Sequence, residues 1–352
     1  MPPARATSSA RALEAILPLI ASGQPYEAHQ KARTFASRYN KSKQYDTAID
    51  VLFQSARELL KAGQQGSGTD LAAFLLDVYE SKGETVNDES RGRLTQLIAL
   101  AGPAGSWRKT IIDKSVAWSA KVGPHPAGDP DLQHYVGELL YKEGSFAAAE
   151  VHLLAAGKRD SARVLAEMFV EWAGPAAPAG PFALRGIIPY LQNGNILAAR
   201  TFIVHFLAQL SARRPSLLSP HQPAPIPVGK PTEAEGQPDE IVFTTEPTLN
   251  FAQLAVRACQ RAQGDKNKTM REAWVRLCGT YQSKAGPVAH REVRKALIEI
   301  AELYFAIPPP RAQQANPLGD MISAMFGGAP QGPGPARRVL AAAPPTSTPG
   351  LD

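Results

Sequence analysis

The chain has 352 residues, a formal net charge of +6 and 44% hydrophobic residues, so it can bury the core of one large or two ordinary domains. No apolar run approaches the ~18–20 residues that a membrane-spanning helix needs. Glu14 and Pro18 interrupt the apolar start of the chain, unlike a secretory signal peptide. The two cysteines, Cys259 and Cys278, form no C-x-x-C motif and no disulfide framework. We therefore expect a protein of the reducing cytosol that does not insert directly into a membrane.

Helix formers dominate the first part of the chain. Residues 1–9 are rich in Pro, Ala and Ser and are expected to be disordered, and a first helix is expected over residues 10–22. Pro25 opens the second helix, because proline is favoured in a first turn. The second and third helices each carry small and bulky apolar residues on one face of a 3.6-residue period. These faces comprise Ala28, Ala32, Phe35 and Tyr39, and then Tyr45, Ala48, Ile49, Leu52, Ala56 and Leu59.

Capping residues indicate where further helices begin. We expect Ser42 to cap the third helix and Thr69 or Ser67 to cap the fourth. Asn87 opens a fifth helix, and Asp129 is followed by Pro130 at the start of a seventh. Later helices are expected over residues 106–121, 131–143, 146–156, 158–172, 182–191 and 196–210. Helix pairs recur about every 35–45 residues, which is typical of helix-turn-helix solenoids.

Residues 211–247 break the helical pattern. Prolines crowd this stretch, and residues 226–228 and 241–245 are its β-type runs. We expect a two-stranded protrusion over residues 223–247, since a long excursion in a helical protein is usually functional or disordered. Helices resume at 249–263, 269–283 and 288–305. Beyond residue 307 the Pro/Gly/Ala-rich tail, 307–352, is expected to be disordered, with an apolar island at 321–326 that is able to dock on a surface.

The fold class predicted from these elements is all-α. We expect one right-handed α-solenoid of helical hairpins, similar to tetratricopeptide repeats, with a small β-hairpin protrusion near its C-terminal end. An N-terminal half would cover residues 10–150 and a C-terminal half residues 151–306.

No pattern in the sequence indicates an enzyme or a cofactor. Residues 63–69 are glycine-rich, but a phosphate loop needs a preceding strand and a final G-K-[ST], so an inter-helix turn is favoured. The seven histidines form no metal-binding spacing. Asp129 and Asp131 flank a helix start, where carboxylates favour the helix dipole, and a catalytic pair is the weaker alternative.

A basic cluster lies on the second expected helix, and it contains no acidic residue. It comprises His29, Lys31, Arg33, Arg38, Lys41 and Lys43. Two interpretations stay open: an ordinary solvated helix face, or an electrostatic docking patch for an acidic protein surface that weakens with salt. Nucleic acid is less favoured, because no exposed aromatic residues are interleaved and no reader motif accompanies the cluster.

A second candidate surface is the excursion together with the helix that follows it. It comprises Ile226, Val228, Ile241, Val242, Phe243, Leu249, Phe251 and Leu254. The excursion either caps the open end of its own solenoid or holds a partner's segment by strand addition or helix-in-groove packing.

Several stretches together resemble one family. They are SGxxYEAHQ…RT…RY…SK.Y..AI and GSGTDL…LL.VY within residues 22–79, GDPDL at 128–132, YKEGSFAAAEVHL at 141–153, and residues 250–254 with NPLGDMISAMFGG near the end. The joint pattern is similar to the α-solenoid scaffold subunit of the GET machinery, which guides tail-anchored membrane proteins to the endoplasmic reticulum. The tail after Ile307 and the Pro-rich lead to the protrusion are longer than in some relatives.

The resemblance implies a non-enzymatic cytosolic scaffold without a cofactor. The N-terminal half would contact the targeting ATPase, with the basic cluster as the matching residues. The C-terminal half would hold a ubiquitin-like subunit, which in turn recruits a co-chaperone. Two alternatives from other classes are a generic solenoid adaptor of a coat or proteasome-lid complex and a basic RNA-binding solenoid.

Overall fold

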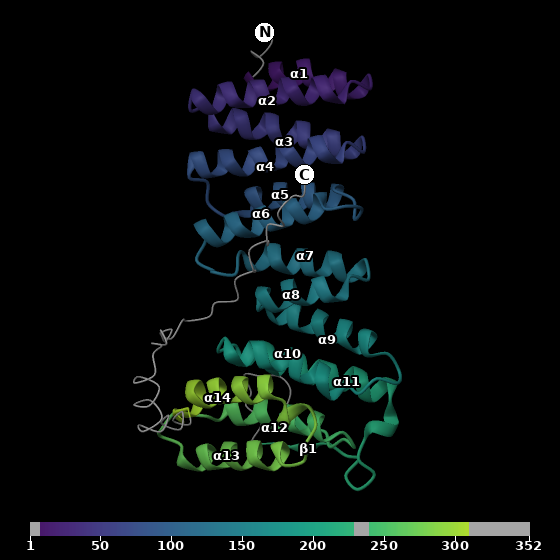
Figure 1. The fold of residues 1–352 in the computed structure, drawn as a ribbon, viewed down its shortest axis with the longest axis vertical. Helices are drawn as coiled ribbons and strands as arrows, with labels where there is room; N and C mark the ends of the chain where they lie inside the picture. Colours follow the sequence, from purple (N-terminus) through teal and green to yellow (C-terminus); the bar gives the residue numbers. More distant parts are fainter. Residues whose placement is uncertain (1–7, 229–238, 310–352) are drawn as a thin grey trace, which may run out of the picture. The chain divides into compact units, whose positions relative to one another are not determined.

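The computed structural model describes residues 8–228 and 239–309. These residues form fourteen α-helices, two short 3₁₀ turns and one two-stranded hairpin (Figure 1), which confirms the expected all-α chain of helical hairpins. They divide into two compact units, one ending at Ala156 and the other beginning at Gly157. The start of the chain, part of the excursion and most of the tail, with its apolar island, lie outside the described residues.

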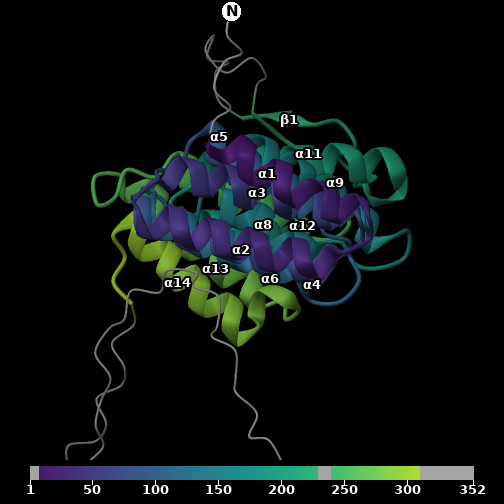
Figure 2. The same cartoon turned by 90° about the horizontal axis from the view of Figure 1, so that it is seen from above.

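The first unit is a two-layer stack of helices. α1, α3 and α5 follow one another in one layer, and α2, α4 and α6 follow one another in the second (Figure 2). α7 and α8 form the last hairpin of the unit. The bounds are α1 Ser8–Ala21, α2 Pro25–Lys41, α3 Tyr45–Lys61, α4 Gln65–Lys82, α5 Asp88–Leu100, α6 Trp107–Val122, α7 Pro130–Lys142 and α8 Phe146–Ala156. The expected apolar faces of α2 and α3 lie in the core, with Phe35, Tyr39 and Tyr45 half-buried at its edge.

The same type of turn joins the two helices of several hairpins. At Gly23, Gly63, Gly144 and Gly194 the chain takes a positive φ of 74–76°, and the next residue's N–H donates to a carbonyl five residues back. The turn between α2 and α3 has the same hydrogen bonds, but Lys43 occupies the left-handed position with φ 60°. A side chain at that φ costs about 1 kcal/mol relative to glycine.

The expected N-caps of α3 and α4 are wrong, because this type of turn precedes both helices. Ser42 ends α2, where its hydroxyl donates to the carbonyl of Tyr39, and it does not cap α3. α4 already begins at Gln65, so Ser67 lies within its first turn and Thr69 is buried inside it. Because of the left-handed turn at Gly63, α4 begins earlier in the sequence than it would if Ser67 or Thr69 were its N-cap. The expected caps at Asn87 and Asp129 are confirmed.

Four glycines within helices lie where a neighbouring helix comes close: Gly68, Gly137, Gly180 and Gly186. A Cβ on Gly68 would lie 2.5 Å from Leu60, and one on Gly137 would lie 2.7 Å from Leu153. These contacts join α3 to α4 and α7 to α8. In the second unit, a Cβ on Gly186 of α10 would lie 2.1 Å from Phe202 of α11. Backbones therefore approach at these points as in other small-residue helix contacts.

The second unit contains the remaining six helices and the hairpin. Its bounds are α9 Arg159–Ala173, α10 Gly180–Gln192, α11 Ile196–Arg213, β1 Ile226–Pro227, β2 Glu240–Ile241, α12 Pro247–Gln260, α13 Lys268–Gln282 and α14 Arg291–Phe305. The antiparallel strands pair Ile226 with Ile241 and Pro227 with Glu240. They are shorter than expected because prolines around β1 have no N–H to donate. After Ile241 the second run turns to bond side chains of α12.

Candidate protein-docking surfaces

The basic cluster lies on α2 and, at Lys43, in the turn that follows it, and its residues are divided between two environments. Lys31, Arg38, Lys41 and Lys43 are exposed, and none of them has an ion pair within the described part of the chain. His29 and Arg33 instead face α4, which packs against α2 in the same layer. All six were predicted to share one face, but the helical period puts His29 and Arg33 on a different side of α2 from Lys31 and Arg38.

Asp70 of α4 is the acidic residue that the sequence analysis missed. His29 Nε2 lies 2.7 Å from the Asp70 carboxylate, and Arg33 also pairs with it. Partial burial acts to raise the pKa of Asp70, but hydrogen bonds from Arg33 and His29 outweigh it and hold that pKa below its usual value. The guanidinium of Arg33 also lies 5.5 Å from the centre of the Phe74 ring. Two of the six basic residues are therefore partly neutralised within the unit.

An open hollow of about 770 Å³ lies over the exposed face of α2. Hydroxyl, amide and basic side chains line it, with one aromatic ring from α4. Its residues are Gln30, Arg33, Thr34, Ser37, Arg38, Lys41, Ser42 and Phe74. Of its three cations, Arg33 is paired with Asp70, whereas Arg38 and Lys41 have no ion pair within the described residues. These two uncompensated cations and the polar walls are chemically suited to an acidic surface.

The excursion lies on α12, and side-chain amides fix it there. Gln253 accepts from the Val242 N–H and donates to the Val242 carbonyl, at 2.9 and 2.8 Å. Asn250 makes the same pair of bonds to Thr244, both at 2.8 Å. These amides complete the backbone hydrogen bonds of the segment as a neighbouring strand would. The segment is therefore held to the helix over residues 242–244.

An aspartate within a group of arginines fixes the start of the same segment. Asp239 pairs with Arg200 of α11 at 2.9 Å and with Arg257 of α12. Arg261 lies 3.6 Å away and donates to the carbonyl of Val228. The Asp239 side chain is only 12% exposed, so these charge-assisted bonds are shielded from solvent.

The side chains predicted for the C-terminal surface differ in burial. Leu249 and Phe251 are fully buried, and the Phe251 ring packs 5.4 Å from Tyr281 of α13. Ile241 is also buried. These three side chains contribute to the core of their own unit, so they offer no contact to a partner in this conformation. Ile226 is 40% exposed, and the half-buried residues are Val228, Val242, Phe243 and Leu254.

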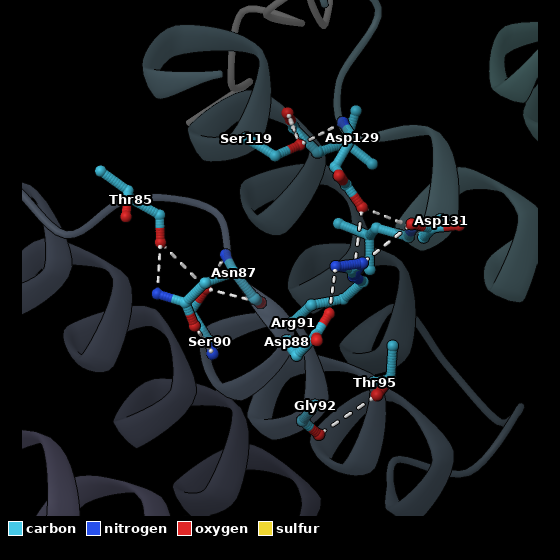
Figure 3. Close-up of polar contacts among 12 residues, drawn as sticks. Thr85, Asn87, Asp88, Ser90, Arg91, Gly92, Thr95, Ser119, Asp129 and Asp131 are labelled. Carbon is cyan, nitrogen blue, oxygen red and sulfur yellow. Dashed lines mark hydrogen bonds and ion pairs between the residues drawn. The ribbon is translucent and has the colours of Figure 1, made fainter. Parts of the chain in front are cut away.

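Asp129 and Asp131 hold helices together. The Asp129 carboxylate accepts from the Leu132 N–H at 2.8 Å and caps α7. Arg91 of α5 lies 2.9 Å from Asp131 and 3.5 Å from Asp129 (Figure 3). The same guanidinium also pairs with Asp88 at 2.9 Å. Both carboxylates thus have a structural role, as the helix-cap interpretation predicts.

Two buried polar contacts in the first unit were not predicted. Arg108 of α6 is buried, pairs with Glu143 at 2.5 Å and donates to the carbonyl of Ala101. His152 Nδ1 lies 2.6 Å from Gln133 Oε1, and burial lowers the pKa of His152 to about 4. The partners are 35 and 19 residues apart in sequence, so no local pattern could indicate them.

Residues 8–228 and 239–309 contain no cluster of three His, Cys, Asp or Glu side chains placed to hold a metal ion. Over the same residues, no helix has both the length and the apolar character needed to cross a bilayer. Burial raises the pKa of both free thiols, to about 12 for Cys278 and further for the more deeply buried Cys259.

The fold places the chain in the class of all-α proteins built from stacked helical hairpins. The chain belongs to the family described as Golgi to ER traffic protein 4, whose sequence pattern it matches over residues 42–326. This assignment confirms the resemblance to the GET-pathway subunit.

Relatives across fungi and animals agree with this assignment. Golgi to ER traffic protein 4 of Aspergillus fumigatus is 36% identical over 329 residues, which covers 89% of this chain and 88% of that protein. The Schizosaccharomyces pombe protein of the same name is 30% identical, covering 87% and 92%. A crystal structure of C. therm. Get4 superimposes with a TM-score of 0.76 at 34% identity, covering 92% of this chain and 97% of that chain.

Proposed function

We propose that this protein is a non-enzymatic cytosolic scaffold for the insertion of tail-anchored proteins into the endoplasmic reticulum membrane. One surface binds the targeting ATPase and another binds a ubiquitin-like subunit. The co-chaperone is recruited through the ubiquitin-like subunit, so its contact with the scaffold is indirect. The scaffold uses no cofactor and no nucleic acid, and it does not itself enter the membrane.

The observation that carries the proposal is the uncompensated positive charge on α2 and the turn after it. Lys31, Arg38, Lys41 and Lys43 are exposed without ion pairs in the described residues, while His29 and Arg33 are held by Asp70. Exposed cations in a polar hollow steer an acidic partner and speed association, and this effect falls as salt rises. The ATPase contact is therefore expected to depend on salt.

The second surface is the exposed part of the hairpin and the segment fixed to α12. Ile226 is exposed there, while Val228, Val242, Phe243 and Leu254 present partial apolar area. Because Gln253, Asn250 and Asp239 hold the segment in place, a partner meets a preformed apolar surface. Preformed apolar contacts depend less on salt than a charged face does.

The test reverses charge on α2 with a matched control. Arg38→Glu with Lys41→Glu is expected to weaken ATPase binding roughly ten-fold at low salt, mostly through slower association. Lys114→Glu with Arg213→Glu makes the same change in net charge at exposed sites elsewhere and is expected to bind normally. Arg33 is left intact, because reversing it would also repel Asp70. Equal dissociation constants for both double variants would refute the α2 assignment.

The second contact is tested in the same preparation. Ile226→Asp is expected to abolish co-elution of the ubiquitin-like subunit on a sizing column and to leave ATPase binding intact. Val151→Asp, at a 64% exposed valine of α8, is the control. RNA retained by the wild type at about 0.15 M salt, and lost in the α2 variant, would favour the RNA-binding alternative instead.

A further inference from the structure

The outer face of α13 carries an apolar groove. Of the fifteen residues of this helix only Trp274 is buried, and the neighbouring Val275 is 57% exposed. A groove of about 500 Å³ lies beside Val275, and Ile307 of the chain after α14 forms part of its lining. The remaining lining residues are Lys268, Arg271, Glu272 and Arg276.

The main chain that places Ile307 in the groove is fixed. Ala306 ends α14 with a φ of 50°, and the Ile307 N–H donates to the carbonyl of Ala301 at 3.2 Å. Arg271 of α13 donates to the carbonyl of Ala306 at 3.3 Å and so ties this end of α14 to the groove. Val275 and Ile307 thus form an apolar strip with three cations and one carboxylate around it.

The chain itself supplies a segment of matching chemistry. Residues 321–326 read Met-Ile-Ser-Ala-Met-Phe, and on a helical period their apolar residues share one face. Asp320 precedes them and complements the cationic rim of the groove. The family match ends at residue 326, with this island, and leaves out the tail that follows. The island therefore lies within the stretch that matches the family pattern.

The length of chain between groove and island permits binding within one molecule. Ile307 already lines the groove, and thirteen residues, 308 to 320, separate it from the island. Such a stretch spans up to about 43 Å when extended. A short tether gives a local concentration in the millimolar range, so even a weak apolar contact is populated.

We propose that residues 321–326 bind the α13 groove of the same chain, with Met321, Ile322, Met325 and Phe326 against Val275 and Ile307. The island covers apolar surface that α13 otherwise leaves exposed. This inference does not rest on the proposed scaffold function.

Photo-crosslinking of the full chain tests the proposal. Phe326→p-benzoyl-L-phenylalanine is irradiated in an equal mixture of light and heavy isotope-labelled chains, and the products are mapped by mass spectrometry. Cross-links within one chain to residues 268–307 are expected. Val275→Asp should lower their yield about ten-fold, since it removes apolar contact area. Val151→Asp, at a similarly exposed valine, should leave the yield unchanged.

Three outcomes would overturn the proposal. Cross-links that join light to heavy chains would mean that a second copy takes the segment. Cross-links outside residues 268–307 would place the island elsewhere. A yield that Val275→Asp does not change would exclude the groove, provided that circular dichroism shows the variant to be folded.

Discussion

Gly186 of α10 packs directly against the ring of Phe202 of α11, so an added methyl group there should be destabilising. A Cβ at this position would lie 2.1 Å from Phe202 Cζ and 2.2 Å from Cε1. Phe202 is fully buried, with ring centres of Phe169 and Phe206 at 5.9 and 5.4 Å. An ordinary contact of about 3.6 Å therefore requires the ring to move about 1.5 Å into occupied space.

The magnitude follows from two opposing effects. Overpacking of a core costs about 1–3 kcal/mol or more, and alanine gains about 1 kcal/mol over glycine in a helix interior. The displacement needed here is large and the site is enclosed, so we expect Gly186→Ala to lower the free energy of unfolding by about 2 kcal/mol net. Urea denaturation followed by circular dichroism and tryptophan fluorescence measures the change.

Gly279 of α13 provides the matched control. It is also helical, but a Cβ there would meet nothing within 4 Å. Gly279→Ala should therefore stabilise by about 0.5–1 kcal/mol through helix propensity alone. If Gly186→Ala proved as stable as Gly279→Ala, the close-approach argument for the α10–α11 crossing would be wrong.

Two further predictions concern the first unit. The folded-state pKa of His152 is about 4, below its usual value of 6.5. Its contribution to the free energy of unfolding is therefore complete above pH 6.5 and is lost as the pH falls toward 4. The loss amounts to roughly 3 kcal/mol at most, and His152→Gln should flatten the unfolding free energy between those pH values; an unchanged slope would contradict this. Lys43→Gly should stabilise by about 1 kcal/mol in urea denaturation, because it relieves the left-handed backbone strain. A destabilised Lys43→Gly variant would show that the lysine side chain contributes more than the turn costs.

The sequence by itself determined the fold class and most element boundaries. Apolar residues at a 3.6-residue period, Pro25 in a first turn and the Asn87 and Asp129 caps are local signals, so the helices that they predict formed as expected. The sequence also located the basic cluster on α2 and the turn after it, and a β-type excursion before α12. The predictions that Ser42 caps α3 and Thr69 caps α4 were wrong. The left-handed turns at Lys43 and Gly63 make these helices begin at Tyr45 and Gln65.

Only the tertiary structure decided which of these residues are available for contact. Asp70 lies 41 residues from His29 in sequence, yet it pairs with two of the six basic residues because α4 packs against α2. Leu249 and Phe251 are buried, although their spacing is equally compatible with an exposed apolar stripe. A helical period identifies which residues share a face. The packing of other helices decides whether that face is exposed to solvent, buried in the core or engaged in ion pairs.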